Sequence, residues 1–122
     1  HPLFKEEAER LADIHRNYNN TSTVVVDIND IYNEFSSGTP DVLAYREYLR
    51  MLYNKYKPQG LEPKNVLLFG DGTFDNKNIL KYNNNFILTW QSENSLDDVV
   101  SYPCEDYIAY LSPYAKGYNV SL

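Results

Sequence analysis

The stretch that decides the fold is Asn65-Val66-Leu67-Leu68-Phe69-Gly70-Asp71-Gly72-Thr73-Phe74-Asp75-Asn76, a short apolar run that ends at Gly-Asp-Gly. Four consecutive apolar residues without polar alternation are typical of a strand that is covered on both faces, as in a parallel sheet. The two glycines around Asp71 predict a turn that leaves this carboxylate at the carboxyl end of the strand, the edge where ligands collect in open α/β sheets. The stretch therefore predicts an α/β fold with a functional edge near residue 71.

The residues on either side of this stretch predict helices that alternate with strands. Residues 23–70 predict a strand, then helices, then a second strand. A helical crossover of this length normally joins parallel strands in a right-handed sense. We expect a three-layer α/β fold of flavodoxin-like type, with a mainly parallel sheet flanked by helices. The expected helices are 3–18, 28–35 and 39–56, the last with Thr39 as its N-cap; the expected strands are 23–27, 66–69 and 86–90, followed by a polar loop, 91–98, and a short final strand within 99–111.

Composition narrows the class of protein. The chain has 122 residues, enough for one domain, and its 43% hydrophobic and 23% charged residues are ordinary for a globular protein. The net charge of −6 argues against a nucleic-acid partner, which needs a basic patch. No apolar run approaches the roughly 20 residues that span a bilayer, so we expect neither membrane insertion nor a signal peptide within these residues. Both ends are expected to be internal points of a longer protein.

Four carboxylates are the candidates for chemistry. Asp71 and Asp75 lie on the turn with Gly72, and Glu105 and Asp106 lie in a later loop. If the sheet is parallel, both loops can converge at its carboxyl edge and hold Ca²⁺, orient a base or receive a cationic side chain. Turn chemistry explains Asp71 and Asp75 equally well, because aspartate side chains accept hydrogen bonds from nearby backbone N–H groups. The spacing of a calcium loop is missing, so we assign no metal and no cofactor.

A catalytic nucleophile is not expected within this chain. Cys104 is the only thiol, and a single cysteine excludes an internal disulfide and a cysteine-based zinc site. A reactive cysteine or serine needs a neighbouring base, and the only imidazoles are His1 and His15. His15 falls on the apolar face of the first predicted helix, which indicates a residue at the edge of the core.

Several stretches have distinctive wording, and in order along the chain they are Ile31-Tyr32-Asn33-Glu34-Phe35-Ser36-Ser37-Gly38 followed by Pro40-Asp41; Leu67-Leu68-Phe69-Gly70-Asp71-Gly72-Thr73-Phe74-Asp75-Asn76; Gln91-Ser92-Glu93-Asn94-Ser95-Leu96; and Ser101-Tyr102 with Glu105-Asp106-Tyr107. In order and spacing they resemble the gingipain family of cysteine peptidases. The resemblance covers nearly the whole chain, from His1 to about Leu111.

This resemblance implies a caspase-like α/β fold and a cell-surface or outer-membrane location. It also implies an endopeptidase that removes C-terminal sorting signals from type IX secretion cargo, which is then attached to surface lipopolysaccharide. The family's catalytic histidine and cysteine lie further along than Leu122. Arginine-specific members place an acidic residue near the position of Glu105 and Asp106, where it receives a basic substrate side chain.

The preferred hypothesis is that residues 1–122 are the N-terminal part of a gingipain-like peptidase domain. They would supply scaffold and a wall of the pocket for a protein or peptide substrate, without the catalytic pair. The alternative is an acidic flavodoxin-like or receiver-like binding module that uses Asp71 for a metal or a phosphoryl group. A third hypothesis is an interaction surface built from the 12 tyrosines. An incomplete sheet would also expose an edge, so we expect dimerisation or strand exchange.

Overall fold

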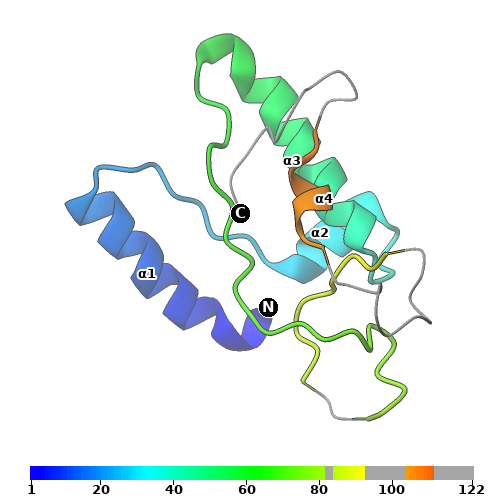
Figure 1. Cartoon of the computed structure of the whole chain (residues 1–122). Coiled ribbons are helices and arrows are strands. Elements are labelled where there is room, and N and C mark those ends of the chain that lie inside the picture. The colour runs from blue at the N-terminus through cyan, green and yellow to red at the C-terminus, as the bar shows by residue number, and fades with distance from the viewer. Residues whose placement is uncertain (82–83, 93–103, 112–122) are drawn as a thin grey trace.

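The computed structural model of the chain describes residues 1–81, 84–92 and 104–111. The three predicted helices are confirmed, with small shifts at their ends (Figure 1). In chain order the elements are a 3₁₀ turn η1 (Pro2–Phe4), α1 (Lys5–Tyr18), α2 (Ile28–Phe35), α3 (Val42–Tyr56), a second 3₁₀ turn η2 (Lys57–Gln59) and α4 (Asp106–Ala109).

The starts of α2 and α3 are fixed by aspartate caps. The Asp27 carboxylate accepts from the N–H of Asn29, and the Asp41 carboxylate accepts from the N–H of Leu43, each at 2.9 Å. The predicted N-cap of the second of these helices, Thr39, is therefore wrong. An aspartate capping in this way satisfies one of the orphan N–H groups of the first turn, so α3 begins after Asp41.

Arg16 ties α1 to the segment that follows it. Its Nε and Nη2 both donate to the carbonyl of Thr23, at 3.0 and 2.8 Å. Its Nη1 donates to Asp13 at 2.8 Å and to Glu9 at 3.2 Å, one and two turns earlier on the helix. One guanidinium therefore sets the direction in which the chain leaves α1.

The predicted parallel sheet is wrong, because the part of the chain that the structure describes contains no strand. Segments 23–27, 66–69 and 86–90 are extended, but only Asn65 and Gln91 carry isolated bridges. The reason lies in the partners of the backbone. The Asp71 carbonyl accepts from the N–H groups of both Phe86 and Ile87, each at 2.9 Å, and much of the remaining pairing is made by side chains.

The predicted final strand within 99–111 is also wrong where it can be compared, because residues 106–109 form α4. The N–H of Ile108 donates to the Glu105 carbonyl at 2.9 Å, which is a helical contact. Three of the apolar residues that suggested a strand, Ile108, Ala109 and Leu111, are buried instead against helices. Most of the predicted loop 91–98, and residues 99–103, lie outside the described residues.

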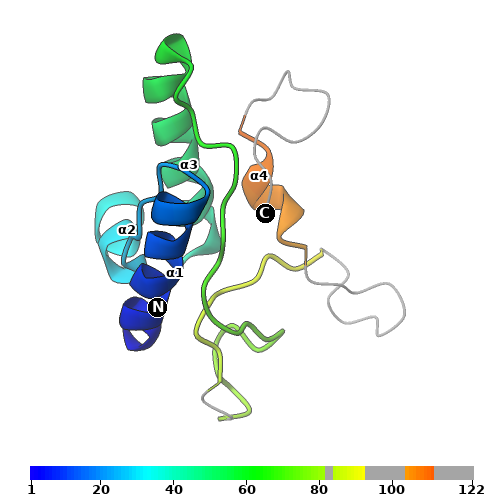
Figure 2. The ribbon, with the colours of Figure 1, turned by 90° about the vertical axis from the view of Figure 1, so that its left-hand side faces the viewer.

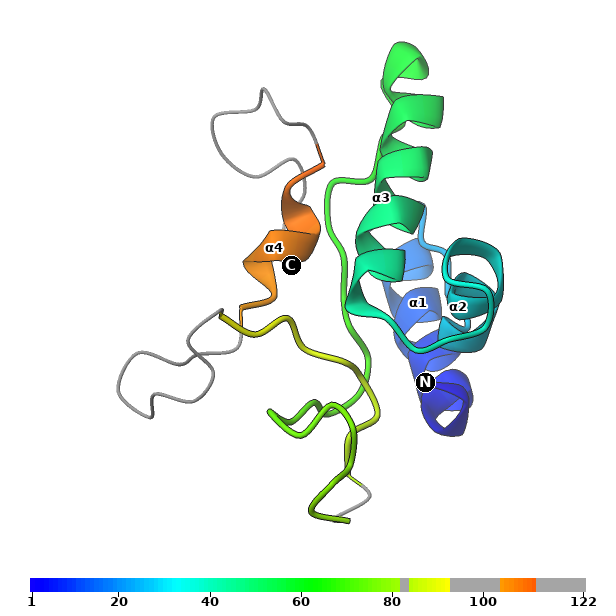
Figure 3. The same ribbon diagram turned by 90° about the vertical axis from the view of Figure 1, so that its right-hand side faces the viewer.

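The extended segment that follows Gly60 passes between α1 and α4 (Figures 1 and 2). Seen from the opposite side, α1, α2 and α3 again lie on one side of this segment and α4 on the other (Figure 3). One apolar core joins the elements, and its buried members are Ile28, Tyr32, Ala44, Tyr45, Leu49, Ile87, Ile108, Ala109 and Leu111. Within the described ranges, no helix has the length and apolar character needed to cross a membrane.

Candidate functional site

Asp75 forms the turn that follows Phe69. Its two carboxylate oxygens accept from the N–H groups of Ile79 at 2.8 Å and Leu80 at 2.6 Å. Its own N–H donates to Thr73 Oγ1 at 3.1 Å. A carboxylate that accepts two backbone N–H groups in this way stabilises a local loop, here the one that runs from Asp75 to Leu80.

The turn packs closely on the segment 85–91. A Cβ on Gly70 would lie 2.8 Å from Ile87 Cγ1, and a Cβ on Gly72 would lie 2.8 Å from the Ile87 carbonyl oxygen. The buried Thr89 hydroxyl donates to the Thr73 carbonyl at 3.1 Å. Gly70 therefore allows the Ile87 side chain to pack on the turn, and Gly72 allows the Ile87 backbone to approach it closely.

Asparagine side chains complete this contact. The Asn76 side chain donates to the Thr89 carbonyl at 2.7 Å and accepts from the Thr89 N–H at 3.1 Å, so it pairs with both backbone groups of one residue. The Asn85 oxygen accepts from the Thr73 N–H at 2.9 Å. An amide side chain carries the same donor and acceptor as a peptide group, which explains how these segments are joined without a strand.

The four predicted carboxylates do not form a metal cluster. In the described ranges, no three histidine, cysteine, aspartate or glutamate residues come together as possible ligands. Their predicted convergence depended on a parallel sheet, and so did the flavodoxin-like or receiver-like alternative for Asp71. Asp71 is exposed, and its carbonyl, rather than its carboxylate, makes the contacts with Phe86 and Ile87.

Glu105 and Asp106 lie at the start of α4, Glu105 as the N-cap residue and Asp106 as the first helical residue. Asp106 is exposed and Glu105 is half-buried. The residue before them is anchored, because the N–H of Cys104 donates to the Trp90 carbonyl at 2.8 Å. The two carboxylates are therefore adjacent on a short helix, held from its N-terminal side by the segment 86–91.

Two residues that sequence reasoning missed contact α4. The Trp90 ring stacks on Tyr107 with 4.9 Å between the ring centroids and 19° between the planes. The guanidinium carbon of Arg46, on α3, lies 4.9 Å from the centroid of the same Tyr107 ring. The periodicity of α3 places Arg46 on its polar side, so the pattern gave no signal that this arginine meets a distant helix.

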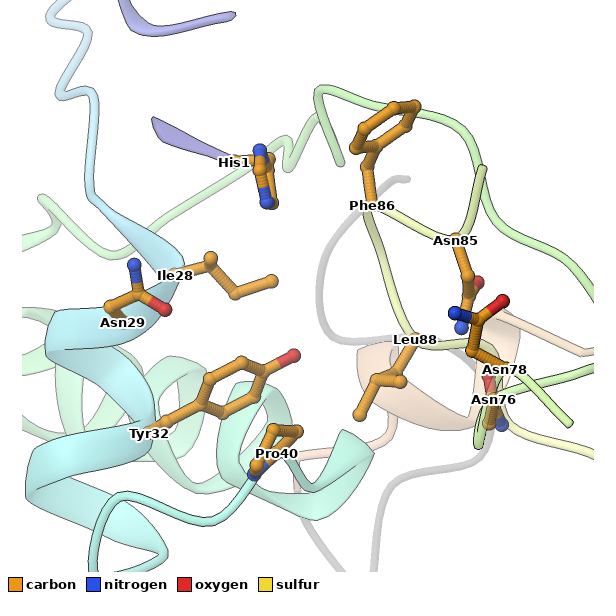
Figure 4. Close-up of a pocket in the computed structure, with 10 residues that line it drawn as sticks. All are labelled: His1, Ile28, Asn29, Tyr32, Pro40, Asn76, Asn78, Asn85, Phe86 and Leu88. Carbon is orange, nitrogen blue, oxygen red and sulfur yellow. The ribbon is translucent and has the colours of Figure 1, made fainter. Parts of the chain in front are cut away.

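A cavity of about 370 Å³ lies between α2 and the segments 76–78 and 85–88 (Figure 4). Ile28 and Tyr32 point toward it from α2 and Leu88 faces them from the other side, while Asn76, Asn78 and Asn85 lie together along one wall. None of the four predicted carboxylates is among its lining residues. The chemistry predicted for Glu105 and Asp106 therefore belongs to α4 and not to this cavity.

Tyr32, which lines this cavity, is paired with a second buried tyrosine, Tyr45. The hydroxyls of Tyr32 and Tyr45 are hydrogen-bonded to each other, and the N–H of Leu88 donates to the Tyr45 hydroxyl at 3.2 Å. Burial raises the pKa of both phenols, and for Tyr32 the hydrogen bond to Tyr45 raises the pKa further. Both tyrosines therefore stay neutral and link α2, α3 and the segment 86–90.

Neither histidine forms a catalytic pair with the thiol. The His1 ring packs edge-on against Phe86 with 5.2 Å between the centroids. His15 Nδ1 lies 3.0 Å from the Asn19 amide nitrogen, within the last turn of α1. Cys104 is a half-buried free thiol that precedes α4. His15 therefore contacts the C-cap residue of its own helix.

Comparison with known proteins agrees with the resemblance seen in the sequence. Residues 1–120 match the profile of Peptidase family C25. Among solved structures, the chain is similar to dimeric latent PorU from Porphyromonas gingivalis, with 34% sequence identity and a TM-score of 0.75. The match covers 94% of this chain and 12% of the PorU chain, and no curated protein sequence matches. The chain therefore belongs to peptidase family C25, the gingipain family.

Proposed function

We propose that this chain is the N-terminal part of a cysteine endopeptidase domain, in which it supplies scaffold and one wall of the substrate pocket. The observation that carries the proposal is the family match over residues 1–120, together with 34% identity to PorU. The chain spans only 12% of the PorU chain that it matches. The activity of the whole protein is therefore part of the proposal.

The pocket wall is the pair of carboxylates on α4. Asp106 is exposed and Glu105 is partly so, and adjacent carboxylates on one short helix suit the side chain of an arginine or a lysine. A guanidinium can donate to two carboxylate oxygens at once, which gives direction as well as charge. The proposed substrate is a peptide with a basic residue at the cleavage site.

The reaction itself is assigned to residues outside this chain. The nucleophilic cysteine and its histidine base lie further along the longer protein, and Cys104 is not the nucleophile. That longer protein removes C-terminal sorting signals from type IX secretion cargo at the cell surface. The contact of His15 with Asn19 and that of His1 with Phe86 support the assignment of the catalytic pair to residues outside this chain.

Fluorogenic peptides that carry a sorting-signal junction test the assignment. We expect this chain alone to give no turnover above the level of a Cys104→Ala variant, because no base accompanies the thiol. The same peptides added to the longer protein are expected to be cleaved. Hydrolysis by the 122-residue chain that disappears in Cys104→Ala would overturn the proposal.

Self-association is a further part of the proposal. The PorU structure similar to this chain is described as dimeric. The sheet edge that the sequence predicted as the contact is not present in the described ranges. Several apolar side chains of the extended segment are exposed instead, among them Leu61 and Leu67. Light scattering at two concentrations tenfold apart should show a rise in mass, and an unchanged monomer mass would count against a dimer.

A further inference from the structure

Three segments that are distant in the sequence meet at Tyr107. Trp90 stacks on its ring, and the guanidinium of Arg46 lies against the same ring. Arg46 Nη1 also donates to the Tyr107 hydroxyl at 3.2 Å, and Arg46 Nε donates to the Tyr110 carbonyl at 2.7 Å. Tyr107 is the second residue of α4 and Tyr110 is its C-cap, so one arginine contacts both ends of the helix.

A helix as short as α4 needs such contacts. It has four residues, and no side chain caps its first turn. Isolated helices of this length do not form in water, because one turn does not repay the cost of nucleation. Burial of Ile108 and Ala109 holds the helix against the core, but apolar burial has no direction. Arg46 and Trp90 add directional contacts at Tyr107 and Tyr110.

These contacts bracket the two carboxylates. Cys104, immediately before Glu105, donates its N–H to the Trp90 carbonyl. Tyr107, immediately after Asp106, lies against the Trp90 ring and the Arg46 guanidinium. We propose that Arg46 and Trp90 are positioning residues that fix Glu105 and Asp106 for binding a basic peptide side chain. This inference rests on the proposed function of α4 as a pocket wall.

Removal of Arg46 should change the affinity for a cationic ligand in opposite directions, depending on whether Arg46 acts by positioning the carboxylates or by its charge. Arg46 is a cation that contacts Tyr107, the residue after Asp106, so its removal should by charge alone strengthen the binding of a cationic ligand. Positioning predicts the opposite. Without Arg46 the helix α4 loses contacts at Tyr107 and Tyr110, so the ligand must supply more of the order of the two carboxylates, and this cost weakens binding.

Calorimetric titration of the 122-residue chain with two peptides provides the test. One is a short acetylated peptide with a single arginine, and the other carries norleucine at that place. We expect Arg46→Met to weaken binding of the arginine peptide about tenfold, equivalent to about 1.4 kcal/mol, and to leave the norleucine peptide unchanged. Arg46→Lys should recover only part of the loss, because an ammonium cannot supply the two-pronged contact.

Arg50→Met is the matched control. Arg50 is one turn further along α3 and pairs with Glu47 at 2.9 Å, so its loss should not change either titration. Hydrogen exchange over 104–111 gives a second readout, and we expect faster exchange in Arg46→Met than in Arg50→Met. Hydrogen exchange over 104–111 also tests Trp90→Ala, for which we expect the same increase. If Arg46→Met does not fold, Arg46→Lys takes its place in both measurements.

The outcomes distinguish the positioning role from the pocket wall. If the double variant Glu105→Gln, Asp106→Asn loses the arginine peptide while Arg46→Met binds it within twofold of the original chain, the positioning inference is overturned and the pocket wall stands. If the double variant binds as tightly as the original chain, or if the original chain does not bind the arginine peptide, both are overturned. Tighter binding by Arg46→Met would show that charge, and not positioning, governs this surface.

Discussion

Gly72 is placed where two backbones come into contact. A Cβ at this position would lie 2.8 Å from both the Ile87 carbonyl oxygen and Thr89 Cγ2. One of these atoms belongs to the backbone, so rotation of a side chain cannot relieve the clash. We expect Gly72→Ala to lower the free energy of unfolding by about 1–3 kcal/mol, the usual cost of overpacking.

Urea denaturation measures this loss, with Gly60→Ala as the control. Gly60 has a φ of +70°, and a Cβ added there would meet no atom within 4 Å. Its substitution therefore tests backbone strain alone, worth roughly 1–2 kcal/mol. If Gly72→Ala were neutral while Gly60→Ala cost its expected amount, the close approach at residue 72 would be contradicted.

The Tyr32–Tyr45 pair predicts a specific response to alkaline pH. Burial raises the pKa of both phenols above their ordinary value of about 10, so the unfolded chain ionises first as the pH rises. Their contribution to stability is complete below about pH 10 and is lost above it. We expect the melting temperature to fall more steeply above pH 10 in the original chain than in the double variant Tyr32→Phe, Tyr45→Phe.

Thermal melts between pH 8 and 11 test this expectation, with Tyr18→Phe as the control. Tyr18 is 83% exposed, so its removal should leave the slope of the original chain unchanged. Equal slopes for the original chain and the double variant would show that the pair is not the group that titrates.

At the scale of an element, the start of α3 allows two candidate N-cap residues, Asp41 and Thr39, to be compared. Asp41 accepts the capping hydrogen bond from Leu43, whereas Thr39 is exposed two residues earlier. We expect Asp41→Ala to cost about 1 kcal/mol of stability and Thr39→Ala to be close to neutral. Circular dichroism during urea denaturation measures both, and a larger loss at Thr39 would restore it as the cap.

The helices were predictable from sequence and the extended segments were not, for a physical reason. A helix satisfies the hydrogen bonds of its own backbone. The apolar periodicity of the segment and a nearby capping residue such as Asp41 are therefore enough to predict that the helix forms. An extended segment needs a partner, and an apolar run such as 66–69 does not say which one it has. Here important partners are side-chain amides, above all Asn76, which pairs with both backbone groups of Thr89.

The candidate site shows the same limit. Glu105 and Asp106 are candidates as loop carboxylates and through a family resemblance, and their role in substrate binding stays a prediction. Arg46 could not be found, because its contacts with Tyr107 and Tyr110 span 61 and 64 residues. A sequence pattern reports a residue's neighbours within a few turns, and this arginine is defined by neighbours far along the chain.

At the scale of the whole molecule, stability is distributed unevenly among the helices. α3 buries Ala44, Tyr45 and Leu49 in the core, whereas α1 buries only Ala12. We expect amide hydrogen exchange to be slowest in α3 and markedly faster in α1, because local opening of α1 exposes little apolar surface. Exchange measured by mass spectrometry checks this order, and equal protection of the two helices would contradict it.

The side-chain pairing of Asn76 with Thr89 has a consequence for the order in which the chain folds. These residues are 13 apart in sequence, whereas Arg46 and Tyr110 are 64 apart. The entropy of loop closure grows by about 0.6 kcal/mol for each doubling of loop length, so the longer closure costs about 1.4 kcal/mol more. The paired turn should therefore form early, and α4 should dock last onto a surface that is already in place.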